Sequence, residues 1–129
     1  MKHLPSVLLM LIASFAGFAA ETKPAAPPQK QQFLYVLRPV PRLFDDKAWT
    51  PADNAVIGRH FNHLKAATDR GQVILAGRTI EPGDQTMGLV IFEAADEPSA
   101  RAFMNSDPAV TEKIMTATLH PYVIALQAR

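Results

Sequence analysis

Two side chains in this sequence have the chemistry to move a proton at neutral pH, provided that the fold brings them together. His60 lies in the segment 59–64, and Asp107 directly precedes Pro108. Histidine titrates near neutrality, and a neighbouring carboxylate fixes its tautomer and stabilises its cation. Asp before Pro is typical of a helix start, where N–H groups and the helix dipole keep the carboxylate ionised. The candidate catalytic residues are therefore His60, as the general acid or base, and Asp107, as its orienting partner.

Each of these residues also has a purely structural interpretation. Asp107 could serve only as an N-cap, an interaction that contributes about 1 kcal/mol. His60 could be a partly buried histidine with satisfied hydrogen bonds. No activated serine or cysteine is evident as a partner for the histidine, so proton transfer with a bound small molecule is favoured over covalent catalysis.

Three further residues are candidates for substrate binding. Arg38 and Arg78 end the first and second predicted strands, and a guanidinium group matches the geometry of a carboxylate. Tyr35, in the first strand, could line the same pocket. Solvated arginines at strand ends, and a tyrosine in the core or at a dimer interface, are the alternatives.

Neither a metal site nor a cofactor is expected. The chain contains no cysteine, which excludes disulfides, thiolate chemistry and cysteine-based zinc sites. His60 and His63 lie three residues apart on a predicted helix, a spacing that can bring two imidazoles together. No third ligand is evident, however, apart from the distant His120.

The first nineteen residues have the composition of a secretory signal peptide. Lys2 and His3 form a short cationic start, residues 4–18 are almost wholly apolar, and small residues at 17 and 19 suit a signal peptidase. The rival interpretation, an uncleaved membrane anchor, requires a longer apolar run of about 20 residues. We therefore expect cleavage after Ala19, export to the periplasm or the exterior, and no stable membrane insertion of the mature chain.

The charge of the mature chain argues against a polyanionic partner. Loss of Lys2 reduces the 13 basic residues to 12, which equals the 12 acidic residues. A net charge near zero without blocks of like charge is not typical of a surface that binds nucleic acid or an anionic membrane. We expect a small-molecule ligand and no nucleic acid.

The rest of the chain divides into a linker and one domain. Residues 20–32 contain three prolines and no large apolar side chain, as is typical of a flexible linker. The domain is predicted at 33–127 from alternating strand and helix patterns. The expected strands are 33–38, 72–79, 86–92 and 118–126, and the expected helices begin at 51, 97 and 108, the first ending at Gly71 and the third running to 115.

This order predicts an α+β, ferredoxin-like βαββαβ fold with a four-stranded antiparallel sheet and helices on one face. The first, third and fourth predicted strands are apolar at both odd and even positions, whereas a sheet with one wet face should alternate. The helices can cover only one face. We therefore expect a homodimer formed through the open sheet face.

The motifs of the domain, taken together, resemble the YciI (YCII-related) family over residues 33–126. They are His60, Leu64, Asp69-Arg70-Gly71, Ala76-Gly77, Ala100-Arg101-Ala102-Phe103, Ser106-Asp107-Pro108 and His120-Pro121-Tyr122. The resemblance implies a dimeric α+β barrel with an active site around a His and an Asp that match His60 and Asp107. A dehydrochlorinase acting on a chlorinated hydroxyquinol is an enzymatic member of that family.

This chain departs from the family pattern in its signal-peptide-like start, in an insertion containing Trp49, and in Arg78, where proline is usual. The resulting prediction is an exported small-molecule enzyme that uses a His-Asp pair for general acid-base chemistry and resembles a lyase by analogy. The alternatives are a non-catalytic module, either ligand-binding or structural, and a protein that docks another protein through the loop 39–49.

Overall fold

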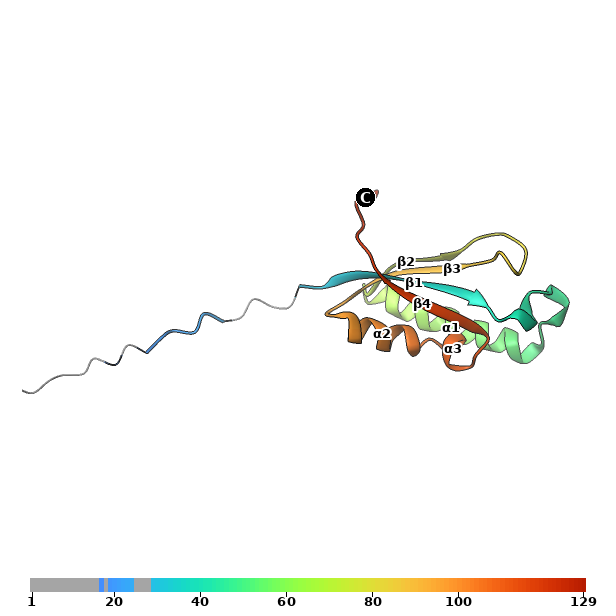
Figure 1. Cartoon of the computed structure of the whole chain (residues 1–129), viewed down its shortest axis with the longest axis horizontal. Helices are drawn as coiled ribbons and strands as arrows, with labels where there is room; N and C mark the ends of the chain where they lie inside the picture. Colours follow the sequence, from blue (N-terminus) through green and yellow to red (C-terminus); the bar gives the residue numbers. More distant parts are fainter. Residues whose placement is uncertain (1–16, 18, 25–28) are drawn as a thin grey trace, which may run out of the picture.

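The computed structural model describes residues 17, 19–24 and 29–129 of the chain. Its elements, labelled in Figure 1 where there is room, are β1 (Gln31–Pro39), the short 3-10 helices η1 (Pro41–Leu43) and η2 (Asp46–Ala48), α1 (Pro51–Asp69), β2 (Val73–Arg78), β3 (Gly88–Ala94), α2 (Glu97–Asn105), α3 (Pro108–Thr111) and β4 (Met115–Pro121).

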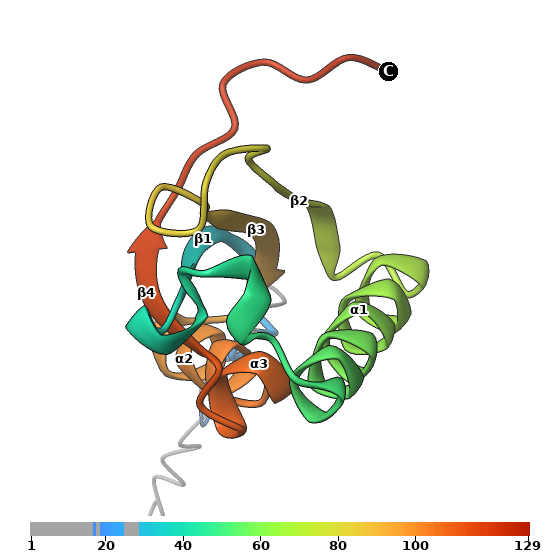
Figure 2. The same ribbon diagram turned by 90° about the vertical axis from the view of Figure 1, so that its right-hand side faces the viewer.

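The four strands form one antiparallel sheet in the order β2-β3-β1-β4. All three α-helices lie against the same face of this sheet (Figure 1). In the view of Figure 2, α2 and α3 lie below β1 and β4, whereas α1 lies on the side of β2. The arrangement confirms the predicted α+β, ferredoxin-like fold.

The inner face of the sheet supplies much of the core, because side chains alternate between the two faces of a strand. In β1, Phe33, Tyr35 and Leu37 are each at most 2% exposed. Phe92 of β3 packs against Phe103 of α2, with ring centroids 4.9 Å apart. These aromatic contacts fix the distance between the sheet and α2.

Helix α1 begins and ends at residues whose local chemistry predicts both boundaries. The Thr50 side chain accepts a hydrogen bond from the Asp53 amide, and the Asp53 carboxylate accepts one from the Thr50 amide, which forms a capping box. Pro51 occupies the first helical position. Gly71 follows the last turn with a φ of 80°, a conformation that glycine adopts without steric cost.

The starts of β1 and β3 differ from the predicted ones. β1 begins at Gln31, inside the segment predicted as linker, because Gln31 and Gln32 continue the backbone ladder with β3. β3 begins at Gly88 rather than at 86. The Thr86 hydroxyl instead donates to the Glu81 carbonyl, so that part of the sequence closes the turn.

Helix α3 is shorter than predicted, ending at Thr111 rather than at 115. Lys113 adopts a φ of 58°, and a non-glycine residue in the left-handed region cannot continue a right-handed helix. The chain therefore turns at Lys113 and enters β4 at Met115.

The last strand is Met115–Pro121, and the prediction of 118–126 is wrong at both ends. Thr116 to Leu119 pair with β1, which places the strand earlier than its apolar content suggested. Beyond Pro121 the chain has no regular secondary structure, and Val123 is 80% exposed. The apolar residues of this tail therefore do not belong to the core.

A β-bulge interrupts the pairing of β2 with β3. Val73 lies opposite Phe92, and Leu75 lies opposite Ile91, so Ile74 is the extra residue. After the bulge, Arg78 lies opposite Gly88. The bulge thereby sets which side chains of β2 face the helices.

The outer face of the sheet is apolar and is not covered by any helix of the described chain (Figure 1). Leu34 and Ile91 lie opposite each other on this face, as do Val36 and Leu89. Leu75 extends the apolar surface and is 57% exposed.

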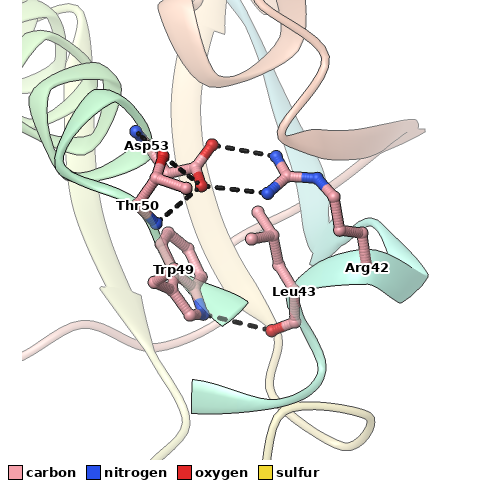
Figure 3. Close-up of polar contacts among 5 residues, drawn as sticks. All are labelled: Arg42, Leu43, Trp49, Thr50 and Asp53. Atoms are coloured by element: carbon pink, nitrogen blue, oxygen red, sulfur yellow. Dashed lines mark hydrogen bonds and ion pairs between the residues drawn. The ribbon is translucent and has the colours of Figure 1, made fainter. Parts of the chain in front are cut away.

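The segment 40–49 packs against the start of α1 (Figure 3). Arg42 donates two hydrogen bonds to the Asp53 carboxylate, at 3.0 and 2.9 Å. Trp49 Nε1 donates to the Leu43 carbonyl at 3.1 Å, and the Leu43 side chain is 1% exposed. The inserted segment is therefore packed into a second, smaller core.

Most of the predicted signal peptide, residues 1–19, lies outside the described residues. Residues 20–24 of the predicted linker are exposed and have no regular secondary structure. In the described part of the chain, we find no helix that combines the length and the apolar character required to span a membrane.

Candidate functional site

Asp107 is the central residue of a polar cluster inside the domain. Its side chain is fully buried, and its Oδ1 accepts a hydrogen bond from the Ala109 amide at 2.9 Å. Asp107 is thus the N-cap of α3, as its position before Pro108 predicts. Capping occupies one lone pair of the carboxylate and leaves the others for side chains.

Two side chains from distant parts of the sequence meet this carboxylate. His60 Nδ1, from α1, lies 2.7 Å from Asp107 Oδ1. The Tyr35 hydroxyl, from β1, donates to Asp107 Oδ2 at 2.8 Å. The fold therefore brings His60 and Asp107 together and adds a tyrosine on the second carboxylate oxygen.

The surroundings of Asp107 favour its ionised form. Burial raises the pKa of this carboxyl, but the hydrogen bond and charge of His60, followed by the bonds from Tyr35 and Ala109, lower it more, so the net pKa lies below its usual range. Burial, followed by the charge and hydrogen bond of Asp107, raises the pKa of Tyr35. Tyr35 is therefore a neutral donor, and Asp107 is a carboxylate at neutral pH.

A cavity of about 550 Å³ lies between α1 and the sheet, and His60 lines it. Its apolar lining includes Leu37 of β1, Ile57 and Phe61 of α1, and Val90 of β3. A volume of this size suits a small organic molecule. Neither Asp107 nor Tyr35 lines the cavity, so His60 is the member of the cluster that a ligand can reach.

The hydrogen bond to Asp107 decides which atom of His60 is available for chemistry. Nδ1 faces the carboxylate at 2.7 Å, which fixes the tautomer with Nδ1 protonated in the neutral ring. Nε2 is then the nitrogen that can accept or donate a proton at the cavity. The His60 side chain is 16% exposed, which is enough access for a ligand in the cavity and little for bulk water.

The three residues predicted to bind substrate occupy different places. Arg78 lines the cavity with His60. Arg38 is exposed between the buried Leu37 and Pro39, which places it on the outer face of the sheet. Tyr35 is buried beneath the cavity and contacts Asp107 instead. Of the three, only Arg78 shares the cavity.

His63, the second histidine of α1, lies apart from the cavity. Its ring stacks on Phe103 with centroids 5.3 Å apart, and its buried Nε2 has no hydrogen-bond partner among the described residues. Burial lowers the pKa of His63; the charge of Asp107 offsets part of this, and Arg70 and His60 lower it further. His63 is therefore a partly buried, neutral imidazole that packs on the aromatic core.

Within the described residues, no group of three or more His, Cys, Asp or Glu side chains is arranged to hold a metal ion.

Two features of the site were not predicted from the sequence. Tyr35 was expected at the ligand, not as the second partner of Asp107. Phe61, which is 64% exposed and lines the cavity, was not among the predicted site residues.

The protein is thus a ferredoxin-like α+β domain in which a buried carboxylate contacts a histidine that lines a cavity. The family model of the YCII-related domain matches residues 34–118, and the chain belongs to that family. Among curated proteins, none matches the sequence significantly.

The fold is similar to the solved structure of 5-chloro-2-hydroxyhydroquinone dehydrochlorinase from Burkholderia phenoliruptrix AC1100, in complex with 2,5-dihydroxybenzoquinone. The TM-score is 0.51 and the sequence identity 17%, over 71% of this chain and 93% of that chain. At this identity the similarity concerns the fold.

Proposed function

We propose that this protein is a small-molecule enzyme in which His60 transfers protons to and from a ligand bound in the cavity. The observation that supports this most is the 2.7 Å contact between His60 Nδ1 and Asp107 Oδ1, which leaves Nε2 for the ligand. Asp107 is a positioning residue: it orients the ring and stabilises the imidazolium that forms when Nε2 takes a proton.

The lining of the cavity supports proton transfer over covalent catalysis. Thr68 is the hydroxyl-bearing residue of that lining in the described chain, and its hydroxyl donates to the Leu64 carbonyl at 2.8 Å. No general base activates it, so it is a poor nucleophile. His60, in contrast, has an ionised partner and an accessible nitrogen.

By analogy with the dehydrochlorinase of similar fold, we propose an elimination as the reaction type. His60 Nε2 would take a proton from the ligand, the electron pair of the broken bond to hydrogen would form a new double bond, and the leaving group would depart with its own bonding pair. For the keto tautomer of a chlorinated hydroxyquinol, in which chlorine is bound to a tetrahedral carbon, the products of such a step are chloride, a hydroxybenzoquinone and a proton held on His60. A general base placed in this way contributes about 10²- to 10⁴-fold to the rate.

The test uses 5-chloro-2-hydroxyhydroquinone and measures chloride release by the wild type, His60→Gln and His63→Gln. We expect kcat/KM to fall by about 100-fold or more in His60→Gln and to stay near the wild-type value in His63→Gln. Equal rates for the wild type and His60→Gln would contradict the role of His60. If the wild type raises no chloride signal but its melting temperature rises with the compound, the protein is a binding module rather than a dehydrochlorinase.

We further propose that two copies pair through the outer face of the sheet. The support is the apolar surface formed by Leu34, Val36, Leu89 and Ile91, which no helix of the described chain covers. Light scattering after size exclusion should give the mass of a dimer for the wild type and of a monomer for Val36→Arg. A monomeric wild type would refute the pairing.

We also propose export, on the basis of the cationic and apolar pattern of residues 1–19. Expression of the full chain in a Gram-negative host, followed by fractionation and N-terminal sequencing, tests it. A mature chain that begins at Ala20 in the periplasmic fraction is expected. An intact N-terminus in the cytoplasmic fraction would count against export.

A further inference from the structure

Arg78 faces the cavity because of the way β2 pairs with β3. It lies opposite Gly88, two residues beyond the pair formed by Ala76 and the buried Val90. It therefore shares the inner face with Ala76 and Val90. Because Gly88 has no side chain, no cross-strand group covers the guanidinium from that position.

The charges around the cavity leave Arg78 without a partner. Besides His60, the ionisable side chains of the lining are Lys65, Asp69 and Arg78. Lys65 Nζ lies 2.7 Å from Asp69 Oδ2, so these two charges compensate each other. Arg78 forms no ion pair or side-chain hydrogen bond with any residue of the described chain. The cavity thus combines an apolar lining with one uncompensated positive charge.

We propose that Arg78 selects the substrate class of this site: small organic anions with an apolar, planar body and a carboxylate or comparable oxyanion. The anionic group pairs with the Arg78 guanidinium, the body lies against Leu37, Ile57 and Phe61, and the reacting hydrogen faces His60. This inference rests on the proposed function for the role of His60. The binding step itself does not depend on that role.

The physical basis is the strength of a charged hydrogen bond from the guanidinium of Arg78, an exposed residue that lines the cavity. A guanidinium binds a carboxylate through two parallel N–H groups, with about twice the strength of a neutral hydrogen bond. A neutral ligand of the same shape leaves the guanidinium without this partner. Discrimination between an anion and its neutral isostere is therefore the property that Arg78 adds.

Arg38 provides a matched control within the same sheet. It is an arginine near the end of β1, exposed on the outer face, and it does not line the cavity. The pair of variants Arg78→Gln and Arg38→Gln removes the same charge from the protein in two places. A general electrostatic effect would appear in both variants, whereas recognition in the cavity appears only in Arg78→Gln.

The experiment is a two-dimensional NMR titration of the chain from residue 20 to residue 129 with benzoate and with benzamide, its neutral isostere. We expect benzoate to shift the amide signals of cavity residues with a Kd at least about tenfold lower than that of benzamide. Arg78→Gln should raise the benzoate Kd to the benzamide value, and Arg38→Gln should leave both unchanged. Melting temperatures confirm that each variant is folded.

Several results would overturn the proposal. They are equal affinity of the wild type for the two probes, absence of benzoate binding in the wild type, and equal losses in Arg78→Gln and Arg38→Gln. Failure of the proposed function is a separate result, because the titration requires no turnover. If His60→Gln keeps its preference for benzoate while the wild type shows no chloride release, anion selection stands and the enzymatic proposal does not.

Discussion

The two buried aspartates, Asp53 and Asp107, have similar local roles and different surroundings. Each stabilises a helix start, and each carboxylate accepts several hydrogen bonds. The hydrogen bonds of Arg42 and Thr50 lower the pKa of Asp53, and the pKa of Asp107 is also lowered, against the effect of its burial. Both residues are therefore ionised at neutral pH.

The difference lies in the side chains that they hold. Arg42 cannot be deprotonated under ordinary conditions, so the ion pair with Asp53 can only brace the segment 40–49 (Figure 3). His60 can gain and lose a proton, and it lines a cavity. A buried carboxylate becomes part of a reactive site when its partner can exchange protons and reach a ligand.

The largest effect is expected when the charge of each aspartate is removed in turn. Asp107→Asn keeps a good N-cap but loses the charge that orients His60 and stabilises the imidazolium. We expect kcat/KM for chloride release to fall by about 100-fold or more. Asp53→Asn should leave kcat/KM close to the wild-type value.

Equal losses of kcat/KM in the two variants would show that helix capping, and not orientation of His60, underlies the effect. Circular dichroism at the assay temperature checks that both variants are folded during the measurement.

A smaller effect is expected from the second partner of Asp107. Tyr35→Phe removes one hydroxyl and leaves Asp107 Oδ2 buried without its 2.8 Å hydrogen bond. The free energy of unfolding should fall by about 1–3 kcal/mol, measured by urea denaturation. Tyr122→Phe, in the tail after β4 and 39% exposed, is the matched control and should cost little. Similar values for the two variants would contradict the contribution of the buried bond.

The smallest effect is expected when the ion pair between Arg42 and Asp53 is broken. The lowered pKa of Asp53 means that its ionised form stabilises the fold above the pKa of the unfolded chain, and that this stabilisation is lost as the pH falls toward the folded pKa. Arg42→Gln removes the largest cause of that shift. The variant should melt below the wild type at neutral pH, and the difference should shrink in acid.

Melting curves at neutral pH and at about pH 3 measure this difference. Arg101→Gln, which breaks an exposed pair with Glu97 on α2, should change the melting temperature little at either pH. A difference between Arg42→Gln and the wild type that is the same at both pH values would refute the role of the Asp53 charge.

Features that depend on neighbouring residues could be predicted from the sequence. The capping box of Thr50 and Asp53 and the left-handed Gly71 define α1 through local hydrogen bonds and backbone sterics. The N-cap role of Asp107 is equally local. Each of these needs only a few consecutive residues to be recognised.

Features that depend on distant contacts could not be predicted in the same way. Tyr35 and Asp107 are 72 positions apart in the chain, and nothing near either residue indicates the other. The register of β4 depends on the left-handed turn at Lys113, which lysine adopts only because the surrounding structure requires it. Alternation along β1 could, however, have placed Arg38 on the face opposite Tyr35.

Because of the bulge at Ile74, the orientation of Arg78 depends on the number of residues in β2 rather than on residue type. In an uninterrupted strand, Val73 and Arg78 would point to opposite faces, because they are five positions apart and side chains alternate. One additional residue restores Arg78 to the side of the helices. A homologous strand without this residue would direct the same arginine to the outer surface, so a single insertion or deletion can switch the ligand preference of the cavity while every side chain is kept.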